Sequence, residues 1–283
     1  MTRRALTVLL LSVGLAALAA CGKSAPSKAD YLAKADPVCK RGNELAAVAS
    51  TPSDVAGLKD FTTKLADNLD KTTKELDELD TPGGDDGDAA EAMVKSMKDA
   101  AAALRAVGPD VDAANFTAIE DNGKKASDAL KNADAQARAF GSTECGKGEA
   151  EAGARMQTAL APAVKNAYIA KVDPICAATD KQVEALAEPE SEAQVKDYLT
   201  KLLGIAEKSV AEMRAVPAPR TDKDKLDAFF GAQDKLVNTV RETIAVLSDE
   251  SKLETNLGEL AKAGVDGAAK AGAYGFKECS KTD

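Results

Sequence analysis

The sequence predicts an all-α protein of two tandem four-helix-bundle-like repeats, each closed by one disulfide. Three observations support this prediction: an internal duplication, helical spacing of apolar residues within each copy, and one cysteine near each end of each copy. The 283 residues suffice for about two domains. Apolar residues make up 45% of the chain but aromatic residues only 4%, so alanine supplies much of the apolar content. Small side chains of this kind suit closely packed helices.

The first 20 residues have the pattern of a signal peptide. Arg3 and Arg4 precede an apolar run over residues 5–17, which is shorter than a membrane span. The run ends in Leu-Ala-Ala-Cys at residues 18–21, which resembles a lipobox. The resemblance implies a diacylglycerol on the Cys21 thiol and cleavage between Ala20 and Cys21. The alternative is an ordinary secretory signal with a chance cysteine.

Residues 21–28 read as a lipid-anchored flexible tether, because they contain Gly, Ser, Pro and Lys. A diacyl anchor holds a protein stably on a membrane. We therefore expect the chain to lie on the extracytoplasmic face of the cell membrane. Loss of Arg3 and Arg4 takes the formal charge from -9 to -11. An acidic surface repels phosphate backbones, so we expect no nucleic-acid partner.

The duplication is visible in three matches. Tyr-Leu-Ala-Lys-Ala-Asp-Pro-Val-Cys at residues 31–39 returns as Tyr-Ile-Ala-Lys-Val-Asp-Pro-Ile-Cys at residues 168–176, 137 positions later. The match continues from residues 59–65 to residues 196–202. The closing segments, which end in Cys145 and Cys279, are 134 positions apart, and we place the loss of three residues at the turn over residues 83–87. The predicted repeats are residues 29–148 and 149–283.

Four helices are expected in each repeat, arranged up-down-up-down. Asp36-Pro37 and Asp173-Pro174 are either N-caps followed by a helix-starting proline or kinks in longer helices. A second helix is predicted to start at residues 51–54 and to end before residues 81–84. Apolar residues recur every three or four positions over residues 58–79, 93–107, 198–216 and 226–247.

Four cysteines remain besides the lipidated Cys21. Their places in the duplication predict the pairs Cys39–Cys145 and Cys176–Cys279. An exported protein occupies a compartment where disulfides persist. The alternative pairing joins Cys145 to Cys176 and Cys39 to Cys279. A four-cysteine metal site is disfavoured, because the sequence has no Cys-x-x-Cys spacing.

Little in the sequence indicates catalysis. The chain has no histidine, the commonest general base and metal ligand. The acidic residues over positions 80–88 do not follow the EF-hand pattern and read as a solvated turn. Tyr31 and Lys34, like Tyr168 and Lys171, are interpreted as a packed tyrosine and an exposed lysine. We expect that the protein is not an enzyme and that it binds no metal or cofactor. A hydrolase that uses paired carboxylates is the weakest hypothesis.

The lipobox, the Tyr-x-Ala-x-Ala/Val-Asp-x-Ile/Val-Cys start and the aromatic-Gly…Cys finish together resemble a group of secreted proteins and lipoproteins from high-GC Gram-positive, streptomycete-type bacteria. The resemblance covers most of residues 28–283 and implies disulfide-closed helical units. It implies no particular activity for the chain. The leading hypothesis is a non-enzymatic binding or scaffold lipoprotein of the cell envelope, with an envelope protein or small molecule as partner. The alternative is a solute-binding lipoprotein subunit of a transporter.

Overall fold

The computed structural model describes residues 24–281. The predicted signal peptide, its cleavage site and Cys21 lie outside this range. Within it the secondary structure is α-helical, without strands. The helices are α1 (Lys28–Ala47), α2 (Val55–Asp77), α3 (Asp85–Arg105), α4 (Val107–Asp112), α5 (Phe116–Phe140), α6 (Lys147–Glu184), α7 (Glu192–Ala215), α8 (Lys223–Ala245) and α9 (Glu250–Tyr274).

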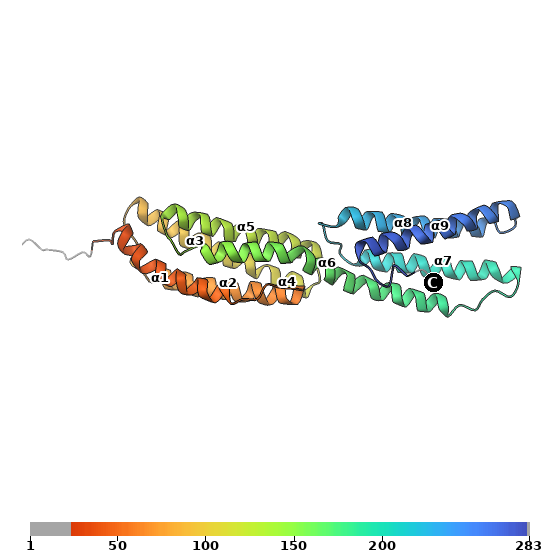
Figure 1. Ribbon diagram of the computed structural model, residues 1–283, viewed down its shortest axis with the longest axis horizontal. Coiled ribbons are helices and arrows are strands. Elements are labelled where there is room, and N and C mark those ends of the chain that lie inside the picture. The colour runs from red at the N-terminus through yellow and green to blue at the C-terminus, as the bar shows by residue number, and fades with distance from the viewer. Residues whose placement is uncertain (1–23, 282–283) are drawn as a thin grey trace, which may run out of the picture.

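The helices form two bundles that lie end to end in an elongated rod (Figure 1). The first contains α1, α2, α3 and α5, with the short α4 between α3 and α5. The second contains the C-terminal half of α6 followed by α7, α8 and α9. The all-α architecture with tandem bundle-like repeats is therefore confirmed.

Capping residues explain where several helices begin and end. Ser27 forms a capping box with Asp30 at the start of α1, and the Asp54 carboxylate caps α2 within the segment predicted to start it. The last long helix of each bundle ends at a glycine in the left-handed region, Gly141 (φ 92°) and Gly275 (φ 113°). Glycine adopts this conformation without the steric cost that a Cβ brings, so both bundles end their last helix in the same way.

The two Asp-Pro pairs lie inside helices, so the N-cap interpretation is wrong and the alternative of a longer helix holds. Pro37 is within α1 and Pro174 is within α6. The aspartates accept hydrogen bonds from the segment before the closing cysteine instead. Asp36 accepts from the Ser142 and Thr143 hydroxyls, and Asp173 accepts from the backbone N–H groups of Lys277 and Glu278. Each aspartate thereby ties the start of its repeat to the end.

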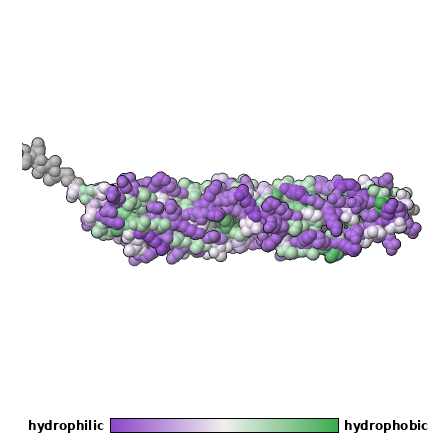
Figure 2. All heavy atoms as spheres, turned by 90° about the horizontal axis from the view of Figure 1, so that it is seen from above, coloured by the Kyte–Doolittle hydropathy of each residue, from purple (hydrophilic) through white to green (hydrophobic). Residues whose placement is uncertain are grey.

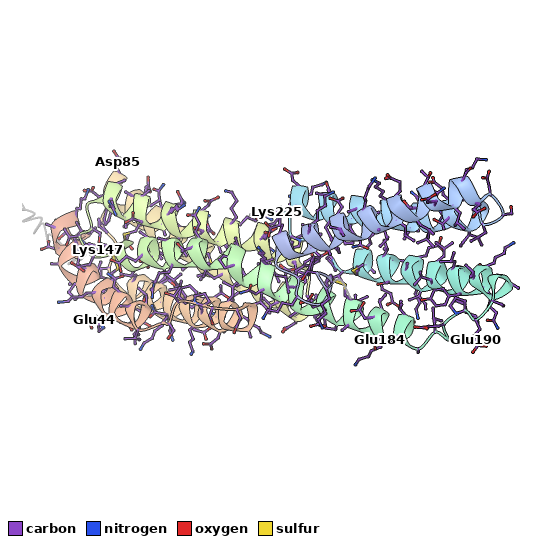
Figure 3. The ribbon with its side chains drawn as sticks, turned by 45° about the vertical axis from the view of Figure 1, so that its right-hand side comes forward. Glu44, Asp85, Lys147, Glu184, Glu190 and Lys225 are labelled. Carbon is purple, nitrogen blue, oxygen red and sulfur yellow. A yellow bond between two sulfur atoms is a disulfide. The ribbon has the colours of Figure 1, made fainter. Side chains whose placement is uncertain are left out.

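Helix α6 runs without interruption through both bundles. Its 38 residues span about 57 Å at 1.5 Å per residue. The boundary expected between residues 148 and 149 lies in the first turn of α6, and residues 147–165 pack against the first bundle. Figure 3 shows Lys147 beside the first bundle and Glu184 in the second. The region corresponding to α1 begins only at Lys165, 137 positions after Lys28.

Two disulfides close the bundles, Cys39–Cys145 and Cys176–Cys279, the pairs predicted from the duplication. Their Cα–Cα distances are 4.8 and 5.1 Å. The cross-repeat pairing is not formed. Each bridge joins the first helix of a repeat to the segment after its last helix, next to the aspartate contacts described above.

An aromatic cluster fills the junction of the bundles. Phe116 of the first bundle meets Tyr168 of α6 edge-on, with ring centroids 5.9 Å apart. Tyr168 also contacts Tyr274 edge-on at 6.0 Å, and Phe276 lies 5.1 Å from Phe229. All these rings are almost fully buried. The bundles therefore share a continuous core as well as a continuous helix.

Candidate binding groove in the second bundle

A groove of about 590 Å³ opens between the helices of the second bundle. Four helices and the closing segment contribute to it. Its apolar walls come from Val183 of α6, Leu202 of α7, Leu236 of α8 and Leu260 of α9. The space lies within the range of about 300–1,000 Å³ typical of ligand sites, but it is a surface groove rather than an enclosed cavity.

The corresponding space in the first bundle is filled by residues 147–165 of α6. This segment lies against α1, α2 and α5. Gly153 accepts a hydrogen bond from the Ser127 hydroxyl of α5 at 3.2 Å, and the Arg155 guanidinium donates to the carbonyls of Ala46 and Ala49 at 2.8 and 2.7 Å. Within residues 24–281, no fifth helix occupies the equivalent space of the second bundle.

Burial of equivalent residues reflects this difference. Leu65 in α2 is 3% exposed, whereas its counterpart Leu202 in α7 is only partly buried. The same change occurs between the buried Ala46 of α1 and the partly buried Val183 of α6. The stripe predicted over residues 198–216 has the same register as that of residues 58–79 but is less completely buried, because part of it faces the groove.

Helix α9 carries exposed apolar residues where α5 carries small or charged ones, and one of them, Val265, lines the groove. Lys131 of α5 corresponds to Val265 of α9, which is 63% exposed. Gly123 corresponds to Leu257, which is 48% exposed. Exposed apolar side chains that cluster on one surface typically mark an interaction site. Apolar residues on the open side of α9 were the signal in the sequence that could have indicated this groove.

Polar and charged residues also line the groove: Thr179, Asp180 and Glu184 of α6, Ser209 of α7, Gln233 of α8, and Glu278 and Lys281 of the closing segment. The Thr179 hydroxyl lies 2.7 Å from the Ser209 hydroxyl and 2.9 Å from the Ile175 carbonyl, so it has hydrogen-bond partners within the protein. Glu278 pairs with Lys281 at the end nearest the disulfide, and Glu184 lies at the C-terminus of α6. The helix terminus adds partial negative charge there. The groove therefore suits an amphipathic occupant with an apolar face, and positive charge is favoured near the end of α6.

Other cavities lie at the α1–α2 loop and at the bundle junction. The first, of about 730 Å³, combines the exposed Leu45 and Val48 with Ser50, Thr51, Ser53 and Asp54. One of about 320 Å³ at the bundle junction contains Glu120, whose carboxylate already accepts hydrogen bonds from backbone N–H groups. The groove of the second bundle is the stronger candidate, because four helices form its walls and the equivalent space of the first bundle is filled by residues 147–165 of α6.

The tyrosines, lysines and acidic residues singled out from the sequence lie in the core or on the surface, away from the groove. Tyr31 and Tyr168 are buried, while Lys34 and Lys171 are exposed, as the packing interpretation predicted. The acidic residues Asp85, Asp86 and Asp88 occupy the first turn of α3. No group of three potential metal ligands among His, Cys, Asp and Glu is present in the described residues. None of these side chains lies in the groove.

Glu149 and Tyr168 are two of the buried groups away from the groove whose acidities are strongly shifted. Desolvation raises the pKa of Glu149, in the first turn of α6, to about 7, and the charge of nearby Asp134 adds to this effect. Desolvation also raises the pKa of Tyr168 to about 12. Both side chains are enclosed by packed helices, so these shifts reflect the cost of burial rather than a reactive cleft.

The fold and groove define a tandem helical-bundle protein with an apolar surface site. No protein-family model, curated protein or solved structure matches the chain. Across the described residues, no helix combines the length and apolar character that a bilayer span requires.

Proposed function

We propose that this protein is a lipid-anchored, non-enzymatic binding protein of the cell envelope, and that it binds its partner in the groove of the second bundle. The open apolar groove is the observation that carries the binding role. The signal-peptide pattern and the lipobox at residues 18–21 support the anchor. The likeness of these motifs to lipoproteins of high-GC Gram-positive bacteria supports the same location.

The arrangement of the rod suits such a role. The first described residues lie at the outer end of the first bundle, and the second bundle forms the opposite part of the rod (Figure 1). A lipid on Cys21 would therefore place the groove at a distance from the membrane. Figure 2 shows a largely hydrophilic surface with scattered apolar areas, as expected for a rod standing in an aqueous layer.

Replacement of the lipidated residue tests the anchor. In cells, Cys21→Ser should move the protein from the membrane fraction to the soluble fraction and abolish incorporation of an alkyne-labelled fatty acid. A serine variant that stays in the membrane and still incorporates the label would contradict lipidation at Cys21.

Site-specific photo-crosslinking tests the groove. A benzophenone amino acid at Val265 should give a discrete adduct in cells. The same probe at Asn238, an exposed α8 residue outside the groove lining, serves as the matched control. Adducts of equal yield at both positions, or none at Val265, would contradict a binding role for the groove.

The solute-binding alternative rests on the groove volume of about 590 Å³. It predicts that the protein purified from its own membranes carries a small molecule. Native mass spectrometry would then show an added mass of a few hundred daltons beyond the lipid, and this mass would disappear in Val265→Glu. An adduct of protein size at Val265 would favour the partner-binding form.

A further inference from the structure

We propose that the occupant of the groove is an amphipathic α-helix of a partner protein, with small apolar residues on its buried face and an arginine near the C-terminus of α6. This inference rests on the proposed binding function and specifies its partner. The internal duplication carries it, because the first bundle shows what the equivalent groove receives. Binding of a helix in an apolar groove is a common mode of peptide recognition.

The helix in the first bundle presents a buried face made mainly of small residues, with one methionine. Gly148, Ala152, Met156, Ala159 and Ala163 are all buried, at spacings of three and four residues. The ideal Cβ of Gly153 would lie 3.4 Å from the Cβ of Leu130, so the helix approaches α5 closely. In the second bundle Gly264 replaces Leu130 and Ala261 replaces Ser127, so there is more room at the position of Gly153. At the other positions of this face we expect the partner helix to carry small residues.

The arginine contact has an equivalent acceptor set in the second bundle. Arg155 donates to Ala46 and Ala49, the carbonyls at the C-terminus of α1, and its guanidinium lies over the Phe61 ring at 5.5 Å. The counterparts of these three residues are Val183 and Leu186 at the end of α6 and Tyr198 on α7. The main-chain carbonyls and an aromatic ring are thus retained, and the partial negative charge of a helix C-terminus favours a cation there.

Two further substitutions between the bundles indicate how the partner helix should differ from residues 147–165. Leu160 packs on Gly123, whose ideal Cβ would lie only 2.8 Å from a Leu160 methyl carbon. Leu257, which lies on α9 outside the groove lining, replaces Gly123 in the second bundle. A partner helix as long as residues 147–165 should therefore carry a small residue in place of Leu160. Gln157 accepts a hydrogen bond from Lys131 at 3.2 Å, and Val265 replaces that lysine. An apolar residue is therefore expected in place of Gln157.

A synthetic peptide tests this inference directly. The probe is residues 146–166 with Leu160→Ala and Gln157→Leu, labelled with a fluorophore, and the receptor is the chain from residue 22 onward. Fluorescence anisotropy should show saturable binding that weakens at least tenfold in Val265→Glu and is unchanged in Asn238→Glu. The two receptor positions are exposed, so neither change disturbs the core. The peptide with Arg155→Ala should bind at least fivefold more weakly.

The outcomes separate the inference from the proposed function. No saturable binding, or equal binding to Val265→Glu, would overturn the helix partner, while a specific crosslink at Val265 would keep the groove as a binding site for another ligand. If the peptide shows no saturable binding and Val265 gives no specific crosslink, both the helix partner and the binding role of the groove are overturned. A dimer of the chain that Val265→Glu dissociates in analytical ultracentrifugation would assign the groove to a second copy and overturn the partner protein.

Discussion

The carboxylate of Glu120, on α5 of the first bundle, accepts a hydrogen bond from the backbone N–H of Arg220 in the loop between α7 and α8. The same carboxylate accepts from the next N–H, that of Thr221. Glu120 is 8% exposed, so water does not replace these bonds easily. The Thr117 hydroxyl donates to the Ala218 carbonyl nearby. The junction therefore has side-chain contacts on the loop as well as the continuous α6, and we infer that the rod is stiff.

Replacement of Glu120 should loosen the junction. Glu120→Ala leaves two backbone N–H groups without acceptors and should lower the free energy of unfolding by about 1–3 kcal/mol. Distances between spin labels on the two bundles should become more broadly distributed, as measured by pulsed electron paramagnetic resonance. Asp121→Asn is the matched control, because the exposed Asp121–Arg220 ion pair contributes about 1 kcal/mol or less. An unchanged distance distribution in Glu120→Ala would contradict the role of this contact.

The disulfides should stabilise the two bundles separately. Replacement of Cys176 and Cys279 by serine should lower the free energy of unfolding of the second bundle by about 4 kcal/mol, because a bridge between residues 103 positions apart restricts the unfolded chain. Urea unfolding followed by hydrogen exchange would assign the loss to α7–α9. The matched variant lacks Cys39 and Cys145 and should show the loss in the first bundle. Peptides mapped without reduction that link Cys145 to Cys176 would contradict the pairing.

Glu149 should make the protein less stable as the pH rises from about 4.5 to 7. Its pKa is raised to about 7 from the ordinary value of 4.5, so in this window the folded state binds more protons than the unfolded state. The stability is highest below the unfolded pKa, and the loss is complete above about pH 7. Its size is on the order of 3 kcal/mol, since each pKa unit corresponds to about 1.4 kcal/mol.

The variant Glu149→Gln tests this pH dependence. It keeps the shape of the side chain and removes the charge, so its unfolding free energy should change less between pH 5 and pH 8. Urea titrations at the two pH values measure the difference. Glu151→Gln, an exposed position on the same helix, should behave like the unchanged protein. An identical pH dependence in Glu149→Gln would show that another group is responsible.

Asp173 should protect the closing segment of the second repeat. Asp173→Ala removes the acceptor for the N–H groups of Lys277 and Glu278, which lie 3.1 and 3.2 Å from its carboxylate. These two amides should exchange with deuterium at least tenfold faster, and the free energy of unfolding should fall by about 1–2 kcal/mol. Lys171→Ala, an exposed change on the same helix, should leave both values unaltered. Unchanged exchange in Asp173→Ala would contradict this contact.

The sequence by itself determined the class of fold, because duplication, helical spacing and cysteine positions are local or pairwise patterns. Asp54 shows this well: a capping residue before an apolar stripe predicts where α2 starts, and the structure begins the helix at Val55. The pairs Cys39–Cys145 and Cys176–Cys279 followed from the same logic, since duplicated positions fold alike.

Only the tertiary structure decided that this side of the first bundle is covered and that the equivalent side of the second bundle is open. Residues 147–165 have a weak, alanine-rich pattern, and the sequence does not show that this segment continues through Pro162 and Pro174 as one helix. Its packing against α1 and α5 depends on contacts such as Ser127 with Gly153, which join distant parts of the chain. Leu65 and Leu202 occupy equivalent positions on similar stripes, yet only Leu65 is almost fully buried. Burial is set by what covers a helix face, and in the first bundle that cover is the extra length of α6.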